Sequence, residues 1–361
     1  MDFVKLASIC NLKQWSTIAK TDLSDSGYPV WGANGIIGYS NKYNHTERTI
    51  MICCRGATCG SINISDGKCY INGNAMCLDN LSKEFNLDFI AYYLKNYDFK
   101  KTITGVAQPQ ITKVSLDIVE VPKLPIERQQ EIAQNLKKLE LCLTKTRIKL
   151  KKYDDLVKSQ FIEMFGDPLS NNLFELYELN TVCDVRDGTH DSPKYHDIGY
   201  PLITSKNIID GGISFEDVNL ISKEDYDKIN QRSFVDNGDI LMPMIGTIGN
   251  PVIVDKIRDF AIKNVALIKF YKDSKIDNHF LYYLMKSDSF NHYLKDKNKG
   301  GTQKFVSLGI IRKIKIITPP IELQNQFADF VKHIDKLKFT IKQSIEKLEL
   351  CYESLMKQYF D

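Results

Sequence analysis

Two segments of the chain combine lysine, glycine, threonine and glutamine, a composition suited to contacts with nucleic acid. In the first segment Lys101 and Thr104 lead into Gln108, and in the second residues 299–304 read Lys-Gly-Gly-Thr-Gln-Lys. Lysine and threonine can hold phosphates, glycine lets the backbone approach closely, and glutamine can make two hydrogen bonds to adenine. The candidate contacts of the second segment are Lys299, Thr302, Gln303 and Lys304. A solvated loop at a helix end is the alternative for either segment alone, but the recurrence favours DNA contacts.

Residues 186–194 place a histidine between carboxylates, a grouping that can support acid–base catalysis. His190 stands between Asp187 and Asp191. An Asp-Gly pair ahead of Ser-Pro is also typical of a turn, and the matching earlier part of the chain has no such histidine. We therefore favour a DNA-facing loop over a catalytic site. Its candidate contacts are Arg186, Thr189, His190 and Lys194.

Two glycine-rich turns, at residues 55–60 and 246–249, offer backbone amides that could bind phosphates. Neither turn matches G-x-x-x-x-G-K-[ST] or G-x-G-x-x-G, so the sequence does not support nucleotide binding. Ordinary hairpin turns are the alternative. The candidate DNA contacts in and near these turns are Trp31, Asn34, Arg55, Thr58, Lys206 and Thr247. Core packing is an equally good interpretation of Trp31.

Cysteines are concentrated in one part of the sequence. Five of the nine lie between residues 53 and 77, but no two of them form a C-x-x-C pair. Zinc sites usually present their ligands in pairs at short spacing. We therefore expect reduced, mostly buried thiols, with no metal site and no cofactor.

The candidate residues belong to an internal repeat. Gly27-Tyr28-Pro29 returns 172 residues later, Tyr92-Tyr93-Leu94 returns 190 residues later, and Pro125-Ile126-Glu127 returns 195 residues later. The separation changes only between matching blocks, as expected when insertions fall in surface loops. The sequence therefore predicts a duplicated fold, with about 16 extra residues between positions 209 and 240 of the second copy.

A long helix is predicted after the proline pair that ends each copy. Apolar residues recur there at alternating spacings of three and four over nearly five heptads, which is typical of a coiled coil. At 1.5 Å per residue, about 35 residues give a rod of roughly 50 Å. The two helices would most simply pack antiparallel on each other; packing of each on its own domain is the alternative. The predicted seam residues are Leu136, Leu139, Leu143, Leu150, Val331, Ile334, Ile341, Ile345 and Leu348.

These patterns predict an α+β fold with two similar mixed α/β domains joined by two long helices that form an antiparallel coiled coil. The predicted boundaries are residues 1–125 for the first globular domain, 126–166 for the first long helix, 167–320 for the second domain and 321–361 for the second helix. Two such domains could read one DNA duplex at two places, because its groove repeats every ~34–36 Å.

Composition narrows the classes of protein. The chain has 48 Lys and Arg against 45 Asp and Glu, a net charge of +3, and is 43% hydrophobic and 26% charged. Such values are ordinary for a globular protein and argue against a disordered or fibrous chain. The first residues do not form a signal peptide, and no apolar run approaches the ~18 residues of a membrane span. We therefore expect a cytoplasmic protein that does not bind membranes.

A longer motif occurs in both copies. Gly and Gln are followed by Leu, then by Pro-x-x-Pro or Pro-Pro, and the motif ends in Glu-x-Gln, at residues 105–129 and 301–324. Residues 159–168, Ser-Gln-Phe-Ile-Glu-Met-Phe-Gly-Asp-Pro, close the first long helix. With these motifs the chain resembles the specificity (S) subunit of type I restriction–modification systems over essentially its whole length.

The resemblance implies that each globular domain is a target-recognition domain that reads one half of a split site in double-stranded DNA. The helices would set the gap between the halves and dock two DNA methyltransferase subunits, through which restriction subunits would join the complex. The subunit would not itself be an enzyme. The resemblance does not assign base contacts position by position, so the site residues above rest on loop chemistry.

Two other classes of function remain alternatives. The first is a DNA methyltransferase or nuclease that carries recognition domains; residues 318–321, Thr-Pro-Pro-Ile, lack the Asn or Asp and the aromatic residue that an amino-methyltransferase motif needs. The second is a coiled-coil assembly adaptor that does not read DNA. The basic segments of both copies argue against the adaptor, and salt-dependent binding to duplex DNA would distinguish it.

Overall fold

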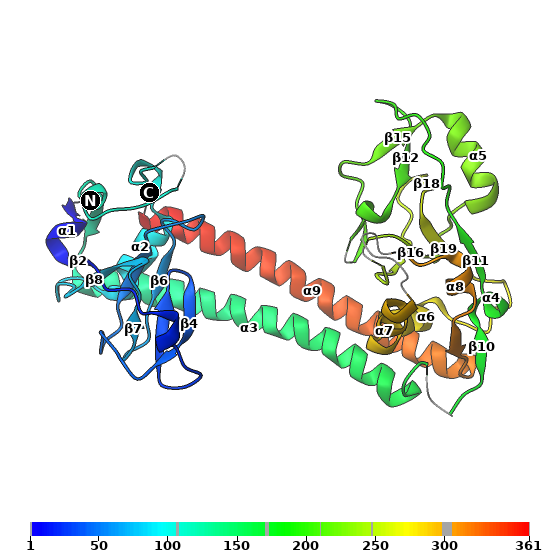
Figure 1. The fold of residues 1–361 in the computed structure, drawn as a ribbon, viewed down its shortest axis with the longest axis horizontal. Coiled ribbons are helices and arrows are strands. Elements are labelled where there is room, and N and C mark those ends of the chain that lie inside the picture. Colours follow the sequence, from blue (N-terminus) through cyan, green and yellow to red (C-terminus); the bar gives the residue numbers. More distant parts are fainter. Residues whose placement is uncertain are drawn as a thin grey trace. The chain divides into compact units, whose positions relative to one another are not determined.

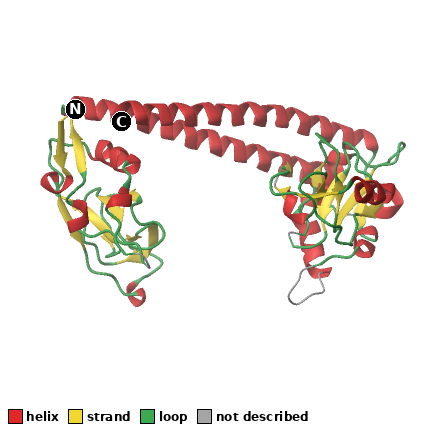
Figure 2. Ribbon diagram, turned by 90° about the horizontal axis from the view of Figure 1, so that it is seen from above, coloured by secondary structure: helices red, strands yellow, loops and turns green. Residues whose placement is uncertain are grey.

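The computed structural model describes residues 2–105, 108–169, 173–209, 211–246, 248–297 and 305–360. The chain divides into two compact units, Met1–Arg147 with Gln343–Asp361, and Ile148–Lys342. Each unit therefore contains one copy of the repeat together with a part of both long helices. Figure 2 shows that both copies mix strands with helices. In the described part of the chain, no helix is both long and apolar enough to cross a membrane.

The first copy is built on a four-stranded antiparallel sheet in the order β2-β8-β5-β6. A three-stranded sheet follows the order β4-β3-β7, and β1 pairs with β9. The strands are β1 (Asp2–Lys5), β2 (Asn11–Gln14), β3 (Tyr28–Gly32), β4 (Gly35–Ser40), β5 (Ile50–Cys53), β6 (Ile62–Ile64), β7 (Tyr70–Ile71), β8 (Ala75–Asp79) and β9 (Glu120–Lys123). The helices of this copy are α1 (Leu6–Ile9), α2 (Leu87–Asn96) and the 3-10 turns Lys20–Asp22, Phe99–Lys101 and Val114–Leu116.

The second copy repeats this topology (Figure 1). Its sheets follow the orders β11-β19-β16-β17 and β15-β12-β18, and β10 pairs with β20. The strands are β10 (Leu176–Glu178), β11 (Asp184–Asp187), β12 (Tyr200–Ile203), β13 (Ile208–Ile209), β14 (Gly212–Ile213), β15 (Asn219–Ile221), β16 (Ile240–Pro243), β17 (Val252–Ile253), β18 (Ala261–Ile262), β19 (Val265–Lys269) and β20 (Lys315–Ile317). The helices are α4 (Leu179–Val182), the 3-10 turn Ser205–Asn207, α5 (Lys223–Ser233), α6 (Asn278–Lys286), α7 (Asp288–Lys297) and α8 (Leu308–Arg312). The predicted duplication is confirmed strand by strand.

The residues inserted in the second copy form structure of their own. β3 and β4 are joined by residues 33–34, whereas the equivalent β12 and β15 are joined by residues 204–218, which contain the β13–β14 hairpin. Helix α5 then lies between β15 and β16. The insertion therefore supplies side chains that the first copy does not offer at this place.

The repeated Gly-Tyr-Pro has a packing reason. Tyr28 pairs with Ser40 across β3 and β4, and a Cβ on Gly27 would lie only 2.5 Å from the backbone oxygen of Ser40. Tyr200 pairs with Ile221, and a Cβ on Gly199 would overlap the backbone oxygen of Ile221. Glycine is needed at both places because the neighbouring strand occupies the space of a side chain.

The long helices are α3 (Ile126–Phe165) and α9 (Ile321–Phe360). In the first unit, Glu140 accepts a hydrogen bond from Tyr352 at 3.3 Å, and Arg147 pairs with Glu349 at 2.6 Å. In the second unit, Lys338 pairs with Asp154 at 2.7 Å. As the residue number rises along α3, the number of the residue that it contacts on α9 falls, so the two helices run antiparallel. The expected fold class is confirmed.

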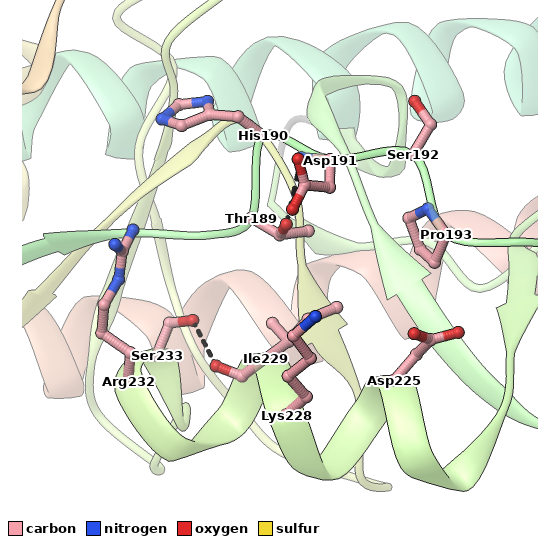
Figure 3. Close-up of a pocket in the computed structure, with 10 residues that line it drawn as sticks. All are labelled: Thr189, His190, Asp191, Ser192, Pro193, Asp225, Lys228, Ile229, Arg232 and Ser233. Atoms are coloured by element: carbon pink, nitrogen blue, oxygen red, sulfur yellow. Dashed lines mark hydrogen bonds between the residues drawn. The ribbon is translucent and has the colours of Figure 1, made fainter.

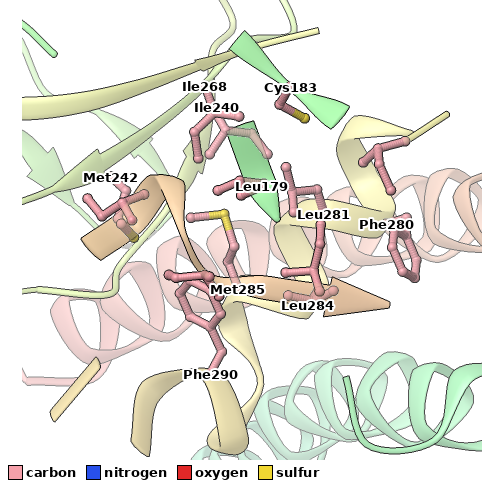
Figure 4. Packing of buried hydrophobic residues seen from close by; sticks show 14 of the residues in the cluster. Leu179, Cys183, Ile240, Met242, Ile268, Phe280, Leu281, Leu284, Met285 and Phe290 are labelled. Carbon is pink, nitrogen blue, oxygen red and sulfur yellow. The ribbon is translucent and has the colours of Figure 1, made fainter. Parts of the chain in front are cut away.

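The predicted seam residues are all at least partly buried. Leu136, Leu143, Val331, Ile334 and Ile341 are between 0% and 8% exposed. The half-buried ones are Leu139, Leu150, Ile345 and Leu348. In the second unit the helix pair enters the globular core. Phe161 and Phe165 of α3 and Phe327 of α9 pack there on Phe280 and its neighbours. Figure 4 shows that core, with Leu281, Leu284 and Met285 of α6 directed into it.

The glutamine of each Glu-x-Gln motif is fully buried and joins a long helix to its globular domain. Gln129 Oε1 accepts a hydrogen bond from the backbone N–H of Asn86, the residue that caps α2, at 2.8 Å. Its Nε2 donates to the backbone oxygens of Glu84 and Leu124 at 2.9 and 2.8 Å. All the polar atoms of the buried amide are therefore used, as burial requires.

Candidate nucleic-acid interface

Three loops of the first copy come together on one exposed polar surface. Asn34, between β3 and β4, donates to the hydroxyl of Thr58 at 2.7 Å. Arg55 forms a β-bridge with Gln110, and Gln110 also bridges to Thr104. The loop that begins at Thr104 thereby lies beside the glycine-rich turn at residues 55–60.

We call Asn34, Arg55, Thr58, Thr104 and Gln108 the first polar surface; all five side chains are exposed. It offers amide, hydroxyl and guanidinium groups, which are the groups that bind phosphates and base edges. Three separate stretches of sequence that were singled out for their loop chemistry thus meet in the fold.

Two other candidates of the first copy have different surroundings. Trp31 is half-buried and packs against the small core cluster of Met51, Cys69 and Cys77. Its Nε1 is buried and has no hydrogen-bond partner among the described residues. Lys101 is exposed at the end of the 3-10 turn after α2. Its ammonium group can therefore reach solvent and phosphates, whereas Trp31 chiefly supports the strand that carries the β3–β4 turn.

In the second copy two of the candidate residues, Thr189 and His190, line a cavity of about 390 Å³ (Figure 3). One wall is the loop of Thr189, His190 and residues 191–193, and the other is α5, with Lys228 and Arg232 facing the loop. Lys194 follows the loop and is exposed. Lys206 is exposed on the 3-10 turn after β12.

His190 is held by a charged network. Its Nδ1 lies 2.7 Å from Asn264 Oδ1 and its Nε2 lies 2.9 Å from Asp187 Oδ2. Arg232 binds the other oxygen of Asp187. The hydrogen bond to Asn264, followed by that to Asp187, raises the pKa of His190 despite opposing contributions from burial and Arg232. The ring is 57% exposed, so it remains at the surface beside the cavity although both of its nitrogens have protein partners.

Arg186 plays a more structural part than its position in the sequence predicts. Its guanidinium binds Asp184 Oδ2 at 2.8 and 2.5 Å and donates to the backbone oxygen of Arg232 at 2.8 Å. It thereby fastens the end of α5 to β11. The remaining candidates of the second copy, Thr247, Lys299, Thr302, Gln303 and Lys304, lie outside the described residues.

The comparison with known families gives a match in both copies. The model of the type I restriction modification DNA specificity domain matches residues 1–152 and again residues 171–350. The chain belongs to this family. The resemblance inferred from the repeated motifs is confirmed.

Curated relatives carry the same description. A putative type I restriction enzyme specificity subunit of Haemophilus influenzae is 26% identical over 363 residues, which cover 94% of this chain and 88% of the relative. A type I restriction enzyme specificity subunit of Methanocaldococcus jannaschii is 24% identical over 341 residues, 86% of this chain and 77% of the relative. The similarity to these members of the family therefore extends through both copies.

Solved structures of the family share the fold. The S subunit of a type I restriction–modification system from M. genitalium has a TM-score of 0.64 with 18% identity, covering 100% of this chain and 96% of that one. A chain from a structural study of complex assembly in a type I R-M system has a TM-score of 0.60 with 14% identity, covering 99% and 97%.

The sequence reasoning missed the contribution of α5 in this specificity-domain chain. Lys228 and Arg232 are four residues apart and so share a face of the helix. The sequence contains a signal for this helix, because residues 222–225 show the Ser-x-x-Asp pattern of a helix start. In the structure Ser222 caps α5 and accepts a hydrogen bond from the backbone N–H of Asp225 at 3.1 Å. The inserted segment could therefore have been predicted as a helix with a basic edge.

Proposed function

We propose that this chain is the DNA-specificity subunit of a type I restriction–modification complex and reads a bipartite target in double-stranded DNA. Each copy would read one half-site. The observation that carries this proposal is the twofold match to the DNA specificity domain, together with the repeated strand order. The predicted boundaries, residues 1–125, 126–166, 167–320 and 321–361, then separate two reading domains from two spacer helices.

The first half-site would be contacted through the first polar surface, with Lys101 on the flanking phosphates. The second would be contacted through His190, Thr189, Lys194 and Lys206, joined by the basic edge of α5. Residues 299–304 and Thr247 are also proposed to contact the second half-site, on the basis of their sequence alone. Mixed guanidinium, hydroxyl and amide groups support it because they can both hold the backbone and read bases.

The helices would dock two DNA methyltransferase subunits, and through them restriction subunits. In a helix pair the outward faces normally carry charged residues. Here Ile148 and Ile162 on α3 and Phe339 on α9 are 51%, 53% and 63% exposed within the second unit. Contiguous apolar patches are typical of a surface that a partner covers, so these three side chains are the candidate docking contacts along the helices.

Catalysis would belong to these partners and the chain itself would be non-catalytic. The description of the relatives as specificity subunits supports this division. We place the complex in the cytoplasm, where its DNA would be.

The test is methylation mapping in cells that carry the chain and its neighbouring methyltransferase, compared with cells that lack only the chain. Two short methylated blocks separated by unspecified bases, present only with the chain, are the expected result. A continuous motif, or methylation independent of the chain, would contradict the proposal and favour an assembly adaptor.

A further inference from the structure

Three side chains with metal-binding atoms meet inside the first copy. A ring nitrogen of His45, Sγ of Cys77 and a carboxylate oxygen of Asp79 lie within 4.8 Å of one another. Cys77 and Asp79 point from the same face of β8, and His45 comes from the segment between β4 and β5, where its backbone bridges to Cys69. His45 is 9% exposed and Cys77 0%.

The hydrogen bonds around His45 determine which ring nitrogen carries a proton. The Asn44 amide donates to the backbone oxygen of Ile71 at 2.9 Å and accepts from its N–H at 2.8 Å, which fixes the orientation of the amide. Asn44 Oδ1 lies 2.7 Å from His45 Nδ1, so Nδ1 must donate. His45 Nε2 is then left facing Asp79 Oδ1 at 3.0 Å.

This pairing requires a proton or a metal ion between Nε2 and the carboxyl group of Asp79. Without either, the lone pair of Nε2 would point at a carboxylate oxygen, which can only accept. The proton could be shared by the two groups, or a metal ion could take its place. The other groups of the site distinguish the two.

Two features favour a metal ion. Cys77 adds a soft sulfur donor beside the same two groups, and a thiolate with a carboxylate would balance the charge of a divalent ion in a buried place. The outer atoms of the ligands are also oriented: His45 Nδ1 donates to an amide oxygen, and Asp79 Oδ2 accepts from Trp15 Nε1 at 3.0 Å. Such outer hydrogen bonds are typical of ligands that hold metal ions.

We propose that His45, Cys77 and Asp79 bind one divalent transition-metal ion, with zinc as the best match to this set of nitrogen, sulfur and oxygen ligands. In a tetrahedral zinc site with bonds of ~2.0–2.3 Å, ligand atoms are roughly 3.3–3.5 Å apart. The 3.0 Å between Nε2 and Oδ1 needs only a small expansion to meet this. Water completes the fourth position.

The site would be confined to the first copy. It ties the segment before β5 to the central sheet through β8. At the equivalent places of β19 the second copy has Leu267 and Lys269, and Lys269 pairs with Asp236 and Asp239 at 2.8 and 2.6 Å. An ion pair thus occupies the position that the metal would hold. The sequence predicted plain buried thiols because the ligands of this proposed site are not paired at short spacing.

Burial raises the pKa of the Cys77 thiol. The metal must therefore displace a proton from sulfur, so binding should release protons and weaken as the pH falls.

The experiment uses the full chain, stripped of metal and titrated with Co²⁺ and then with Zn²⁺. We expect one equivalent of Co²⁺ with a thiolate-to-cobalt charge-transfer band in the near ultraviolet, displacement of that band by Zn²⁺, and a higher melting temperature with Zn²⁺. Cys77→Ser should abolish the band. Cys69→Ser, a matched change of a fully buried cysteine in the same cluster, should keep it.

Two results would overturn the proposal. One is wild-type protein that binds no Co²⁺ or gives no thiolate band, which would assign a proton to the space between His45 and Asp79. The other is a band that persists in Cys77→Ser, which would place the metal elsewhere. If Cys77→Ser does not fold, Asp79→Asn replaces it, and a cobalt affinity unchanged from wild type would equally refute the site.

Discussion

Gln324 Oε1 accepts a hydrogen bond from the backbone N–H of Asp277 at 2.9 Å. Asp277 caps α6, so this bond joins the first turn of α9 to the start of a helix in the second globular core. The Nε2 of Gln324 donates to the backbone oxygens of Lys275 and Pro319, both at 2.8 Å. Gln129 makes the equivalent set in the first copy. The motif that identifies the family is therefore the joint between each long helix and its domain.

The first prediction concerns this joint. Gln324→Ala should lower the free energy of unfolding by about 3 kcal/mol, because it leaves buried backbone groups without partners. This free energy is measured by urea denaturation, from the unfolding transition of the second unit. Gln326→Ala, an exposed residue on the same helix, is the control and should change little. Equal effects of the two substitutions would show that the buried amide contributes no more than an exposed glutamine of the same helix.

The second prediction concerns methyltransferase docking. Replacing exposed Phe339 by Ser should weaken binding of the methyltransferase subunit by about fivefold or more, since a large aromatic side chain at the centre of an interface contributes more than ~1 kcal/mol. Binding is measured by titration calorimetry with the purified subunit. Lys347→Ser, on an exposed part of the same helix, should bind as wild type. Unaltered affinity of Phe339→Ser would move the docking surface elsewhere.

The third prediction concerns DNA reading by each copy. Arg55→Ala should weaken binding at the first half-site by about 1–3 kcal/mol if the guanidinium reads a base, and Lys206→Ala should act on the second half-site alone. Binding to duplexes with either half scrambled, at several salt concentrations, separates these effects. A comparable loss at both halves from one substitution would indicate a folding defect and not a local contact.

The architecture could be predicted from the sequence because it depends on repetition and periodicity. Matching Gly-Tyr-Pro and Glu-x-Gln blocks predicted the duplication, and the spacing of Leu136, Leu143, Ile334 and Ile341 predicted the helix pair. These signals are local in sequence, and each reflects a packing requirement that recurs along the chain.

The detailed sites depend on contacts between distant residues, which one sequence does not reveal. The contact of Asn34 with Thr58 and the meeting of His45 with Cys77 arise only when sheets assemble. Arg186 is predicted to contact DNA, and in the fold its guanidinium also binds Asp184 and the end of α5, two partners that the sequence did not reveal. The chemistry of a side chain can suggest that it contacts DNA. Whether it does so depends on whether other groups of the protein already bind it.

The fourth prediction concerns the spacer. Removing one heptad from each helix, residues 143–149 of α3 with 342–348 of α9, keeps the seam in register and shortens the pair by about 10 Å. The gap between the recognised half-sites should shrink by about three base pairs while both half-sequences stay the same. Methylation mapping reads out the new motif. An unchanged gap with altered bases would refute the spacer role of the helices.

The fifth prediction follows from the raised pKa of His190. Because the folded-state pKa exceeds the unfolded one, the protonated ring stabilises the fold fully below the unfolded pKa of ~6.5, and this stabilisation is lost as the pH rises through the folded pKa. The ring is 57% exposed, so solvent screening limits the contribution to under about 1 kcal/mol. We expect melting curves of the wild type to lose stability over this range relative to His190→Gln.

A second readout of the same substitution tests the role of the ring in DNA binding. Wild-type affinity for the second half-site should fall over the same pH range, because His190 loses its positive charge beside the cavity, whereas His190→Gln should show a flat profile. His196→Gln provides the matched control, as an exposed histidine in the same copy that does not line the cavity. A pH profile unaltered by His190→Gln would remove His190 from the second half-site and leave Arg232 and Lys228 of α5 as its basic contacts.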